Sequence, residues 1–284
     1  MISIIICART KDVSDALKRN IASTIGTKFE LVVVDNSDNR YSIYSAYRVG
    51  VNKARGDICC FMHDDIIFHS LFWGREVELY FQNHPNVGMI GVVGAHFMPI
   101  VPSAWWDNEL LIGHLLQGSE QNGEYVVEEV NYIKRLGSSS SVAVVDGMWM
   151  CFPRKIFEKI EWDSSSFSGF HGYDLDISFQ VWSKGYEVHV IEGVMIEHKS
   201  LGVVQDAYYD TILQVYKKWH GTFPLVKGIV LTDGEIEART RLVEVKNELY
   251  QRHNELKRIY NSFAYSLYMR VKNLKPLRLL RNHL

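Results

Sequence analysis

The chain has 284 residues, of which 47% are hydrophobic and 23% charged, and its formal net charge at pH 7 is −2. This length could hold one large α/β domain with an appendage or two small domains. A charge so close to zero gives no global field that would favour nucleic acid or acidic partners. The balance is uneven, however, because residues 241–284 carry ten Lys/Arg against three Asp/Glu. A basic tail on a mildly acidic body indicates an interaction segment.

The four cysteines show no CxxC spacing and lie within apolar runs, at Cys7, Cys59, Cys60 and Cys151. This pattern is typical of buried thiols in a reducing compartment. No stretch approaches the roughly 18 consecutive apolar residues of a membrane span, and Met1 leads directly into a short apolar strand. We therefore expect a cytoplasmic protein.

Strands and helices are predicted to alternate through the first part of the chain. Short, nearly continuous apolar runs predict strands buried on both faces at 2–7, 31–34, 58–62 and 87–93. Apolar residues at helical spacing predict helices between these strands, at 13–25, 44–51 and about 72–83. This alternation predicts a parallel sheet with right-handed crossovers.

The second part of the chain has a less regular pattern. Residues 95–141 contain Pro99, Pro102 and paired tryptophans, and they are expected to form an irregular lid or substrate-binding loop. Further on, strands are predicted at 142–145, 188–191 and 194–197, and helices at 153–159 and 175–183. Beyond residue 205 the pattern is mostly helical.

Polar residues follow three of the predicted strands. In parallel α/β sheets the ligand site lies beyond the carboxyl ends of the strands. These ends carry Ala8-Arg9, Asp35-Asn36 and His63-Asp64-Asp65. The three groups are therefore expected to converge on one rim of the sheet.

Acidic residues directly after the strand at 58–62 suit a divalent cation that bridges two phosphate groups. Hard oxygen ligands suit Mg²⁺ or Mn²⁺, and such an ion neutralises the charge that builds on a departing diphosphate. The structural alternative is a helix N-cap, for which Asp is common and no metal is needed.

The segment Asn52-Lys53-Ala54-Arg55-Gly56-Asp57-Ile58, followed by Phe61-Met62-His63-Asp64-Asp65, resembles the region around the DxD motif of family 2 glycosyltransferases. The stretches at 3–9 and 33–37 are similar to the first two strand ends of that family. The resemblance implies an α/β protein of the GT-A fold, with a Rossmann-like mixed sheet flanked by helices and a helical C-terminal extension. It implies a catalytic domain at 1–204, with a nucleotide-binding half at 1–94 and an acceptor half at 95–204, and an extension at 205–284.

The same resemblance assigns roles at the strand ends. Asp35 would bind the nucleotide base, and Ala8 and Arg9 would line the same pocket. Asp64 would face the ribose or the metal, and Asp65 would be the main metal-ligating carboxylate. His63 stands where the family usually has its first Asp, and a histidine there can still coordinate metal. For Asp35 the structural alternative is a turn residue that caps a helix.

A second motif supplies the catalytic base. The stretch Phe170-His171-Gly172-Tyr173-Asp174-Leu175-Asp176-Ile177 is similar to the family's G-E-D-x-D-L segment, in which the position of Asp174 is the base of inverting members. An acceptor hydroxyl needs such a carboxylate to take its proton, and attack opposite the departing diphosphate inverts the anomeric centre. Asp176 would cap or orient the turn. Tyr173 replaces the usual Glu and is expected at the acceptor, whereas Gln180 stands where Arg is common. The alternative for Asp174 is an N-cap.

Three further elements complete the expected site. The family often ends its core with a metal-binding His after a short strand, and His198 occupies that position. The run 145–150 resembles the family's acceptor-side strand, in which the small Gly147 would let the acceptor approach. There Asp146 would hydrogen-bond an acceptor hydroxyl and Trp149 would stack on a sugar face. Trp105 and Trp106 are weaker candidates of this kind, and packing is the alternative for all three tryptophans.

The C-terminal region is predicted to be helical and basic at its end. Residues 241–261 mix acids and bases at helical spacing, which is typical of a solvated or self-pairing helix. Residues 265–284 have five Lys/Arg and no acids, interleaved with Leu and Tyr. This composition suits an anionic membrane surface, which would put the protein at the inner face of the membrane. A dimer contact or a frayed end is the alternative.

The sequence thus predicts an inverting, Mn²⁺- or Mg²⁺-dependent glycosyltransferase of polysaccharide biosynthesis, which would use a nucleotide-sugar donor, expected to be uridine-linked, and a glycan or lipid-linked acceptor. One alternative is a catalytically silent nucleotide-sugar-binding module of the same fold. A sugar nucleotidyltransferase ranks lower, because Ala8-Arg9-Thr10-Lys11 lacks the glycine-rich loop that this chemistry needs.

Overall fold

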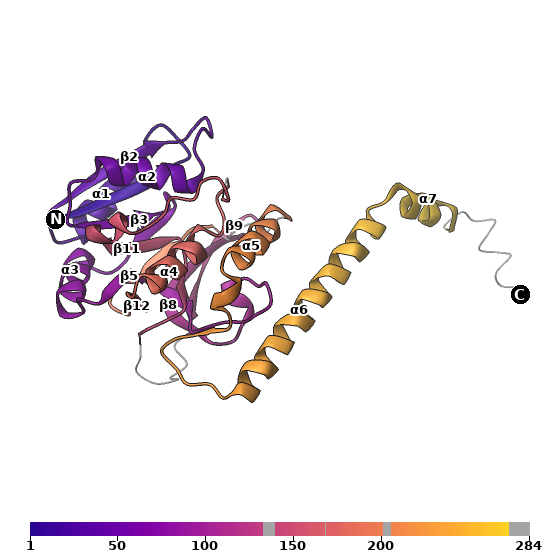
Figure 1. Cartoon of the computed structure of the whole chain (residues 1–284). Helices are drawn as coiled ribbons and strands as arrows, with labels where there is room; N and C mark the ends of the chain where they lie inside the picture. Colours follow the sequence, from indigo (N-terminus) through magenta and orange to yellow (C-terminus); the bar gives the residue numbers. More distant parts are fainter. Residues whose placement is uncertain (133–139, 168, 201–205, 273–284) are drawn as a thin grey trace, which may run out of the picture.

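The computed structural model describes residues 1–132, 140–167, 169–200 and 206–272. Helices and sheets pack together into one body, and a long C-terminal helix projects away from it (Figure 1). Buried apolar side chains form a continuous core beneath both sheets of this body.

The central sheet has six strands in the order β12-β5-β11-β3-β1-β2. Its members are β1 (Ile2–Ala8), β2 (Phe29–Asp35), β3 (Ile58–Met62), β5 (Val87–Gly91), β11 (Trp149–Pro153) and β12 (Glu187–Val190). Neighbouring strands are parallel except for β11, which runs antiparallel to both β3 and β5. The mixed sheet that the resemblance implied is therefore confirmed. Strand–helix alternation by itself predicted a parallel sheet and gave no sign of β11.

Four helices lie close to the positions at which the sequence pattern predicted helices, and they cover this sheet. They are α1 (Asp15–Thr24), α2 (Ile43–Lys53), α3 (Trp73–Asn83) and α4 (Tyr173–Ser183). The stripe of α1 is buried, with Ile21 at 0% and Leu17 at 5% exposure. Burying one such side chain contributes about 1.5–3 kcal/mol. The Ser14 side chain caps α1 by accepting a hydrogen bond from Leu17 N, which is why the helix begins at Asp15.

A second sheet has the order β10-β6-β8-β13-β4, with β9 paired to β8. Its strands are β4 (Ile66–Phe68), β6 (Val93–Ala95), β8 (Leu111–Gln121), β9 (Glu124–Asn131), β10 (Val144–Val145) and β13 (Ile196–His198). The strand predicted at 87–93 is therefore wrong in its extent. The chain leaves the central sheet after β5 and enters the second sheet with β6.

The irregular loop predicted at 95–141 is also wrong, because β8 and β9 form a long antiparallel hairpin within it. The hairpin turns at Asn122 and Gly123, both with positive φ. Asn-Gly is the strongest short-range hairpin signal, so the dipeptide could have revealed this turn. The exposed, charged β9 has no apolar face to mark it as a strand. Short 3₁₀ helices occur at η1 (Trp105–Asp107), at η2 (Arg154–Glu158), where a helix was predicted, and at η3 (His220–Thr222).

The region after residue 205 is helical, as predicted, but its first helix belongs to the body. Helix α5 (Asp206–Lys218) packs beside α4, and the short strand β14 (Leu225–Val226) pairs with β7 (Phe97–Met98). Two more helices follow, α6 (Asp233–Tyr260) and α7 (Phe263–Lys272).

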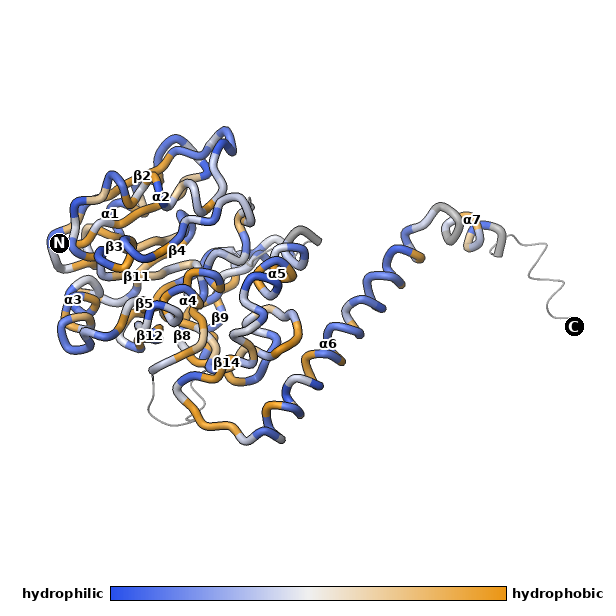
Figure 2. The backbone as a smooth tube through the Cα atoms, in the orientation of Figure 1, coloured by the Kyte–Doolittle hydropathy of each residue, from blue (hydrophilic) through white to orange (hydrophobic). Residues whose placement is uncertain are grey.

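Helix α6 contacts the body through a few residues, and along its length it is mostly hydrophilic with scattered hydrophobic positions (Figure 2). Asn247 donates to Pro102 O at 2.8 Å, and Lys246 donates to Asp107 O at 2.9 Å. Leu249 and Leu256 are more than half exposed. Most of the basic tail that was considered for a membrane or dimer contact lies outside the described residues. No helix among the described ranges is both long and apolar enough to cross a membrane.

One buried carboxylate joins three of these helices. Asp176 of α4 is fully buried and accepts hydrogen bonds from the Tyr44 hydroxyl, from Gln180 Nε2 at 2.8 Å and from Trp219 Nε1 at 2.6 Å. Lys218 Nζ lies 2.9 Å from Asp176 Oδ1 and supplies the compensating positive charge. Gln180 also exchanges two hydrogen bonds with the backbone of Glu161. Gln180, which stands where Arg is common in the family that this chain resembles, thus anchors the segment at Glu161 through these two bonds.

We predict that Asp176→Ala lowers the free energy of unfolding by about 3 kcal/mol, because it leaves three hydrogen-bond donors without this acceptor and Lys218 with Asp163 as its remaining carboxylate. Chemical denaturation monitored by circular dichroism measures the change. Asp38→Ala is the matched control, since Asp38 is exposed and pairs only with the neighbouring Arg40. A loss for Asp176→Ala no larger than that of the control would contradict the structural role.

Candidate functional site

A cavity of about 870 Å³ opens at the carboxyl ends of β1 and β3, within the size range of small-molecule sites. The strand-end groups predicted to converge do so, because Arg9 N donates to Asp64 Oδ2 at 3.1 Å and Asn36 N donates to Ala8 O at 3.0 Å. Predicted site residues that line the cavity are Ala8, Arg9, His63, Asp64, Asp65, Asp146, Gly147, Tyr173, Asp174 and His198.

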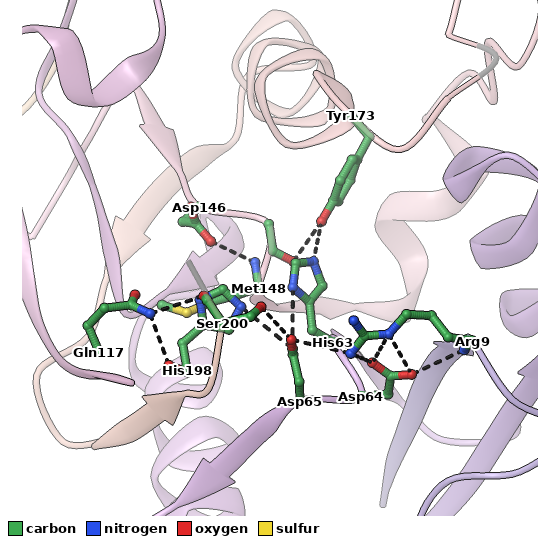
Figure 3. A network of polar contacts seen from close by, with 11 residues as sticks. Arg9, His63, Asp64, Asp65, Gln117, Asp146, Met148, Tyr173, His198 and Ser200 are labelled. Carbon is green, nitrogen blue, oxygen red and sulfur yellow. Dashed lines mark hydrogen bonds and ion pairs between the residues drawn. The ribbon is translucent and has the colours of Figure 1, made fainter. Parts of the chain in front are cut away.

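His63, Asp65 and His198 form one cluster on the cavity wall (Figure 3). Strand β4 follows Asp65 directly and pairs antiparallel with β13, so that His198 stands opposite Ile66. His198 Nε2 consequently lies 3.5 Å from Asp65 Oδ1, and His63 Nδ1 lies 4.0 Å from the same oxygen. One ligand atom from each residue falls within 4.8 Å of the other two, close enough to share one cation.

The donor atoms of this cluster fit a divalent cation. Among the residues that the structure describes, none is a hydrogen-bond partner of the buried His198 Nε2, and an unpaired ring nitrogen of this kind fits a metal ligand. Burial by itself would raise the pKa of Asp65, but His198 and the hydrogen bond from Ser200 outweigh it and hold that pKa well below its usual range. Burial, and then the neighbouring His198, lower the pKa of His63. The cluster thus offers an ionised carboxylate, and in His63 an imidazole whose lowered pKa favours the neutral form that ligates metals.

Arg9 covers the acidic end of the cluster. Its guanidinium lies 2.5 Å from Asp64 and 3.3 Å from Asp65, and its side chain is 69% exposed. Asp64 is thus paired with Arg9 and is not one of the three clustered ligands. Contact of Asp64 with a ribose or with a metal stays a prediction. The exposed guanidinium can meet an anionic group that enters the cavity.

Asp35 does not line the cavity. Its carboxylate accepts hydrogen bonds from Ser37 N at 3.0 Å and from Ser37 Oγ at 2.7 Å, which is the local turn considered as its structural alternative. Asn36 and Asn39 line this end of the cavity instead. The base-binding role expected for Asp35 is therefore corrected in position, because the carboxylate closes its own turn.

Asp174 lies at the start of α4 and faces the same cavity as Asp146. Burial, followed by the negative charge of Asp146, raises the pKa of Asp174 to about 7. A hydrogen bond from Leu175 N at 3.0 Å opposes this rise. The N-cap alternative for Asp174 is wrong, because Gly172 occupies the N-cap position of α4 and Asp174 lies within its first turn. A carboxyl group with such a pKa can accept a proton at neutral pH, which few carboxylates do well.

Trp149 and Gly147 were both expected on the acceptor side, and the structure places them differently from those expectations. Trp149 is fully buried against Trp73, with ring centroids 6.0 Å apart, so its expected stacking on a sugar is wrong. Its position in β11 turns it into the core, whereas the preceding Met148 lines the cavity. At Gly147, a Cβ would lie 2.2 Å from the Tyr173 hydroxyl oxygen. The missing side chain thus makes room for Tyr173, where room for an acceptor had been expected.

Tyr173 is almost fully buried, and its hydroxyl contacts His63 Nε2 at 2.9 Å and Gly147 O at 3.0 Å. Its side chain therefore contacts a candidate metal ligand. Tyr173 also lines the cavity, and its expected place at the acceptor stays a prediction.

Several cavity residues had no signal in the sequence. Gln117 of β8 donates to His198 O at 3.1 Å and to Ser200 O at 3.0 Å, so it fixes the end of β13 beside the cluster. Tyr208 of α5 stacks on Trp106, with ring centroids 5.3 Å apart. These contacts join segments far apart in the chain and follow no local motif. Trp106 lines the cavity and Trp105 is buried beside it.

Comparison with known proteins places these features in a family. A family model described as a glycosyltransferase-like family matches residues 3–219. No curated protein matches the chain. Among solved structures, the mannosyltransferase PcManGT from Pyrobaculum calidifontis, solved with GDP-Man and Mn²⁺, aligns over 98% of this chain and 82% of its own, with 11% identity and a TM-score of 0.51.

Two further structures also align, both with lower TM-scores. GalNAc-T7, solved with UDP, GalNAc and Mn²⁺, is 13% identical over 95% of this chain, with a TM-score of 0.49. The alignment covers 58% of GalNAc-T7, so this chain spans little more than half of that protein. TarS 1–349 from S. aureus, solved with UDP-GlcNAc, is 10% identical over 84% of this chain and 70% of its own, with a TM-score of 0.44. At such identities, likeness extends to the fold alone.

We predict that Asp146→Asn lowers the pKa of Asp174 below about 7. A nearby anion opposes ionisation and raises the pKa, so removing the Asp146 charge must move it downward. Titration of the carboxyl carbons by ¹³C NMR measures the midpoint. Asp38→Asn, at an exposed turn, should leave it unchanged. An unaltered midpoint in Asp146→Asn would show that the two carboxylates are not coupled.

Proposed function

The chain belongs to a glycosyltransferase-like family, and on this premise we propose that it transfers a sugar, with inversion, from a nucleotide diphosphate donor to an acceptor hydroxyl. One observation carries the proposal. A cluster of potential metal ligands and a carboxyl group with a pKa near 7 line the same cavity. Transfer needs both a site for the departing diphosphate and a base for the attacking hydroxyl.

On the donor side, Asp65 and His198, together with His63, would hold Mn²⁺ or Mg²⁺. When bound, this ion would neutralise the charge that builds on the diphosphate as it leaves. Both PcManGT and GalNAc-T7 were solved with Mn²⁺. Arg9, exposed above Asp64 and Asp65, would add positive charge beside the same phosphates.

The nucleotide would occupy the end of the cavity formed by residues 1–94. Ala8, Arg9 and Asp64 line this end together with the buried Asn36, whose amide is held by the backbone of Tyr41. A uridine-linked donor stays a prediction. The two proposed halves are functional regions and not separate folding units, since β11 of the acceptor half lies between β3 and β5 of the other.

On the acceptor side, Asp174 would take the proton of the attacking hydroxyl, and Asp146 would orient that hydroxyl. The neighbouring charge of Asp146 helps to keep Asp174 basic enough for this task. Trp106, stacked on Tyr208 at the cavity wall, is the aromatic surface best placed for a sugar ring. We propose a glycan or lipid-linked acceptor. A cytoplasmic location, with the basic tail on a membrane or on a second copy, stays a prediction.

We predict that one nucleotide sugar from a panel of UDP- and GDP-linked donors raises the melting temperature, and that it does so only with Mn²⁺ present. Coupled binding stabilises the folded chain by mass action, to an extent set by donor concentration over Kd. A thermal-shift screen with and without Mn²⁺ measures this. The same shift in the absence of any metal would contradict metal-dependent donor binding. Donor binding without transfer to any acceptor would favour a silent module of the same fold.

We also predict that Asp174→Asn reduces the transfer rate about 10²- to 10⁴-fold while donor binding is retained, because the amide cannot accept the proton. Single-turnover transfer measures the rate, and the thermal shift with donor provides the control. The rate of the wild-type chain should rise with pH and level off above about 7, since only the ionised Asp174 is a base. Full activity of Asp174→Asn would eliminate this residue as the base.

A further inference from the structure

Two of the positions at which the motifs of this chain depart from the pattern of the family that it resembles contact each other. His63 stands in place of an Asp and Tyr173 in place of a Glu, and His63 Nε2 lies 2.9 Å from the Tyr173 hydroxyl (Figure 3). The two residues come from the end of β3 and the start of α4. A contact between them indicates that the substitutions work together.

The hydrogen bonds of Tyr173 decide which nitrogen of His63 carries the proton. The Tyr173 hydroxyl donates to Gly147 O at 3.0 Å, because a carbonyl oxygen can only accept. The same hydroxyl must then accept its second hydrogen bond from His63, so that Nε2 carries the proton. His63 Nδ1 is left with a free lone pair. This nitrogen is the one that lies 4.0 Å from Asp65 Oδ1.

Packing holds this arrangement in place. Tyr173 is 4% exposed, and its ring meets Tyr47 edge-on with centroids 5.8 Å apart. The phenol reaches the backbone only because Gly147 has no side chain there. His63 N also donates to Met148 O at 2.9 Å, which fixes the backbone of the ligand itself. The imidazole is thus oriented before any cation arrives.

His198 supplies the second nitrogen. Its buried Nε2 has no hydrogen-bond partner within the described part of the chain and lies 3.5 Å from Asp65 Oδ1, and its ring centroid lies 5.6 Å from that of His63. The three donor atoms that face one another are therefore two imidazole nitrogens and one carboxylate oxygen. Imidazole favours transition metals, whereas Mg²⁺ and Ca²⁺ prefer an all-oxygen environment.

We propose that Tyr173 is a positioning residue that presents His63 as a nitrogen ligand, so that this site selects divalent transition metals over Mg²⁺. The inference deepens the proposed function, since it concerns the cation of the same site. Of the two cations expected for this site, the inference favours the transition metal Mn²⁺ over Mg²⁺. The first-row series further orders the affinities, with Co²⁺ and Zn²⁺ bound more tightly than Mn²⁺.

Direct metal binding tests the proposal without donor or acceptor. The metal-free full chain is titrated with Co²⁺, Mn²⁺ and Mg²⁺ by calorimetry, and Co²⁺ binding is also followed by its visible absorption. We expect Co²⁺ to bind at least about tenfold more tightly than Mn²⁺, and Mg²⁺ to bind more weakly than both. Equal or tighter binding of Mg²⁺ would overturn the proposal.

Tyr173→Phe removes only the hydroxyl and keeps the ring. Loss of such a partner of a ligating histidine typically weakens metal binding 10- to 100-fold, so we expect this loss for Co²⁺ together with a changed absorption spectrum. Tyr216→Phe is the matched control, because that buried tyrosine bonds Ser103 away from the cluster. Equal Co²⁺ affinity in Tyr173→Phe and in the control would overturn the positioning role.

The ligand exchange His63→Asp provides an independent measurement. It restores an oxygen donor and should shift preference toward Mg²⁺, so that the ratio of Co²⁺ to Mg²⁺ affinity falls at least about tenfold. In this background Tyr173→Phe should have no further effect, because Tyr173 acts through the imidazole. An unchanged metal ratio would refute ligation by His63. A chain that binds metals in the expected order but transfers no sugar would instead refute the proposed function alone.

Discussion

The antiparallel pairing of β4 with β13 is the constraint on which the candidate site depends. Asp65 directly precedes β4, and His198 is the last residue of β13. The pairing of these two strands brings the His198 imidazole to the Asp65 carboxylate. Gln117, from the neighbouring β8, binds the backbone at both His198 and Ser200 and so holds the end of β13 in position. The second sheet thus positions the proposed metal ligand His198 at a cavity that also opens at the carboxyl ends of the central strands β1 and β3. A hairpin that looked like a loop in the sequence is part of this scaffold.

Three buried or half-buried carboxylates have different properties because their surroundings differ. Asp65 is kept ionised by His198 and Ser200, which suits a cation ligand. Asp174 is pushed toward protonation by burial and by Asp146, which suits proton transfer. Asp176, two residues later on the same helix, is fully paired with Lys218 and three hydrogen-bond donors, which suits a structural joint. The same functional group is thus suited to three different tasks, because its environment differs at each position.

Departures from the family pattern are matched by residues distant in the sequence. Gln180 lacks the charge of the usual Arg, and Lys218 of α5 brings a cation to the carboxylate that Gln180 also binds. His63 lacks the carboxylate of the usual Asp, and Tyr173 of α4 orients the imidazole that replaces it. The sequence assigned helix α5 to a C-terminal extension, but this helix packs on the body and contributes Tyr208 to the lining of the cavity.

Local pattern was sufficient for much of this protein. Apolar runs marked β1, β2 and β3, a four-residue stripe marked α1, and short motifs marked Asp65, Asp174 and His198 as residues that share one cavity. These features are legible because they depend on neighbours within a few positions in the chain. Tertiary structure alone decided that β11 enters the central sheet, that Trp149 turns into the core, and that Tyr173 faces His63. Each of these outcomes is set by contacts between distant segments, and no spacing within one segment records which partner it will meet.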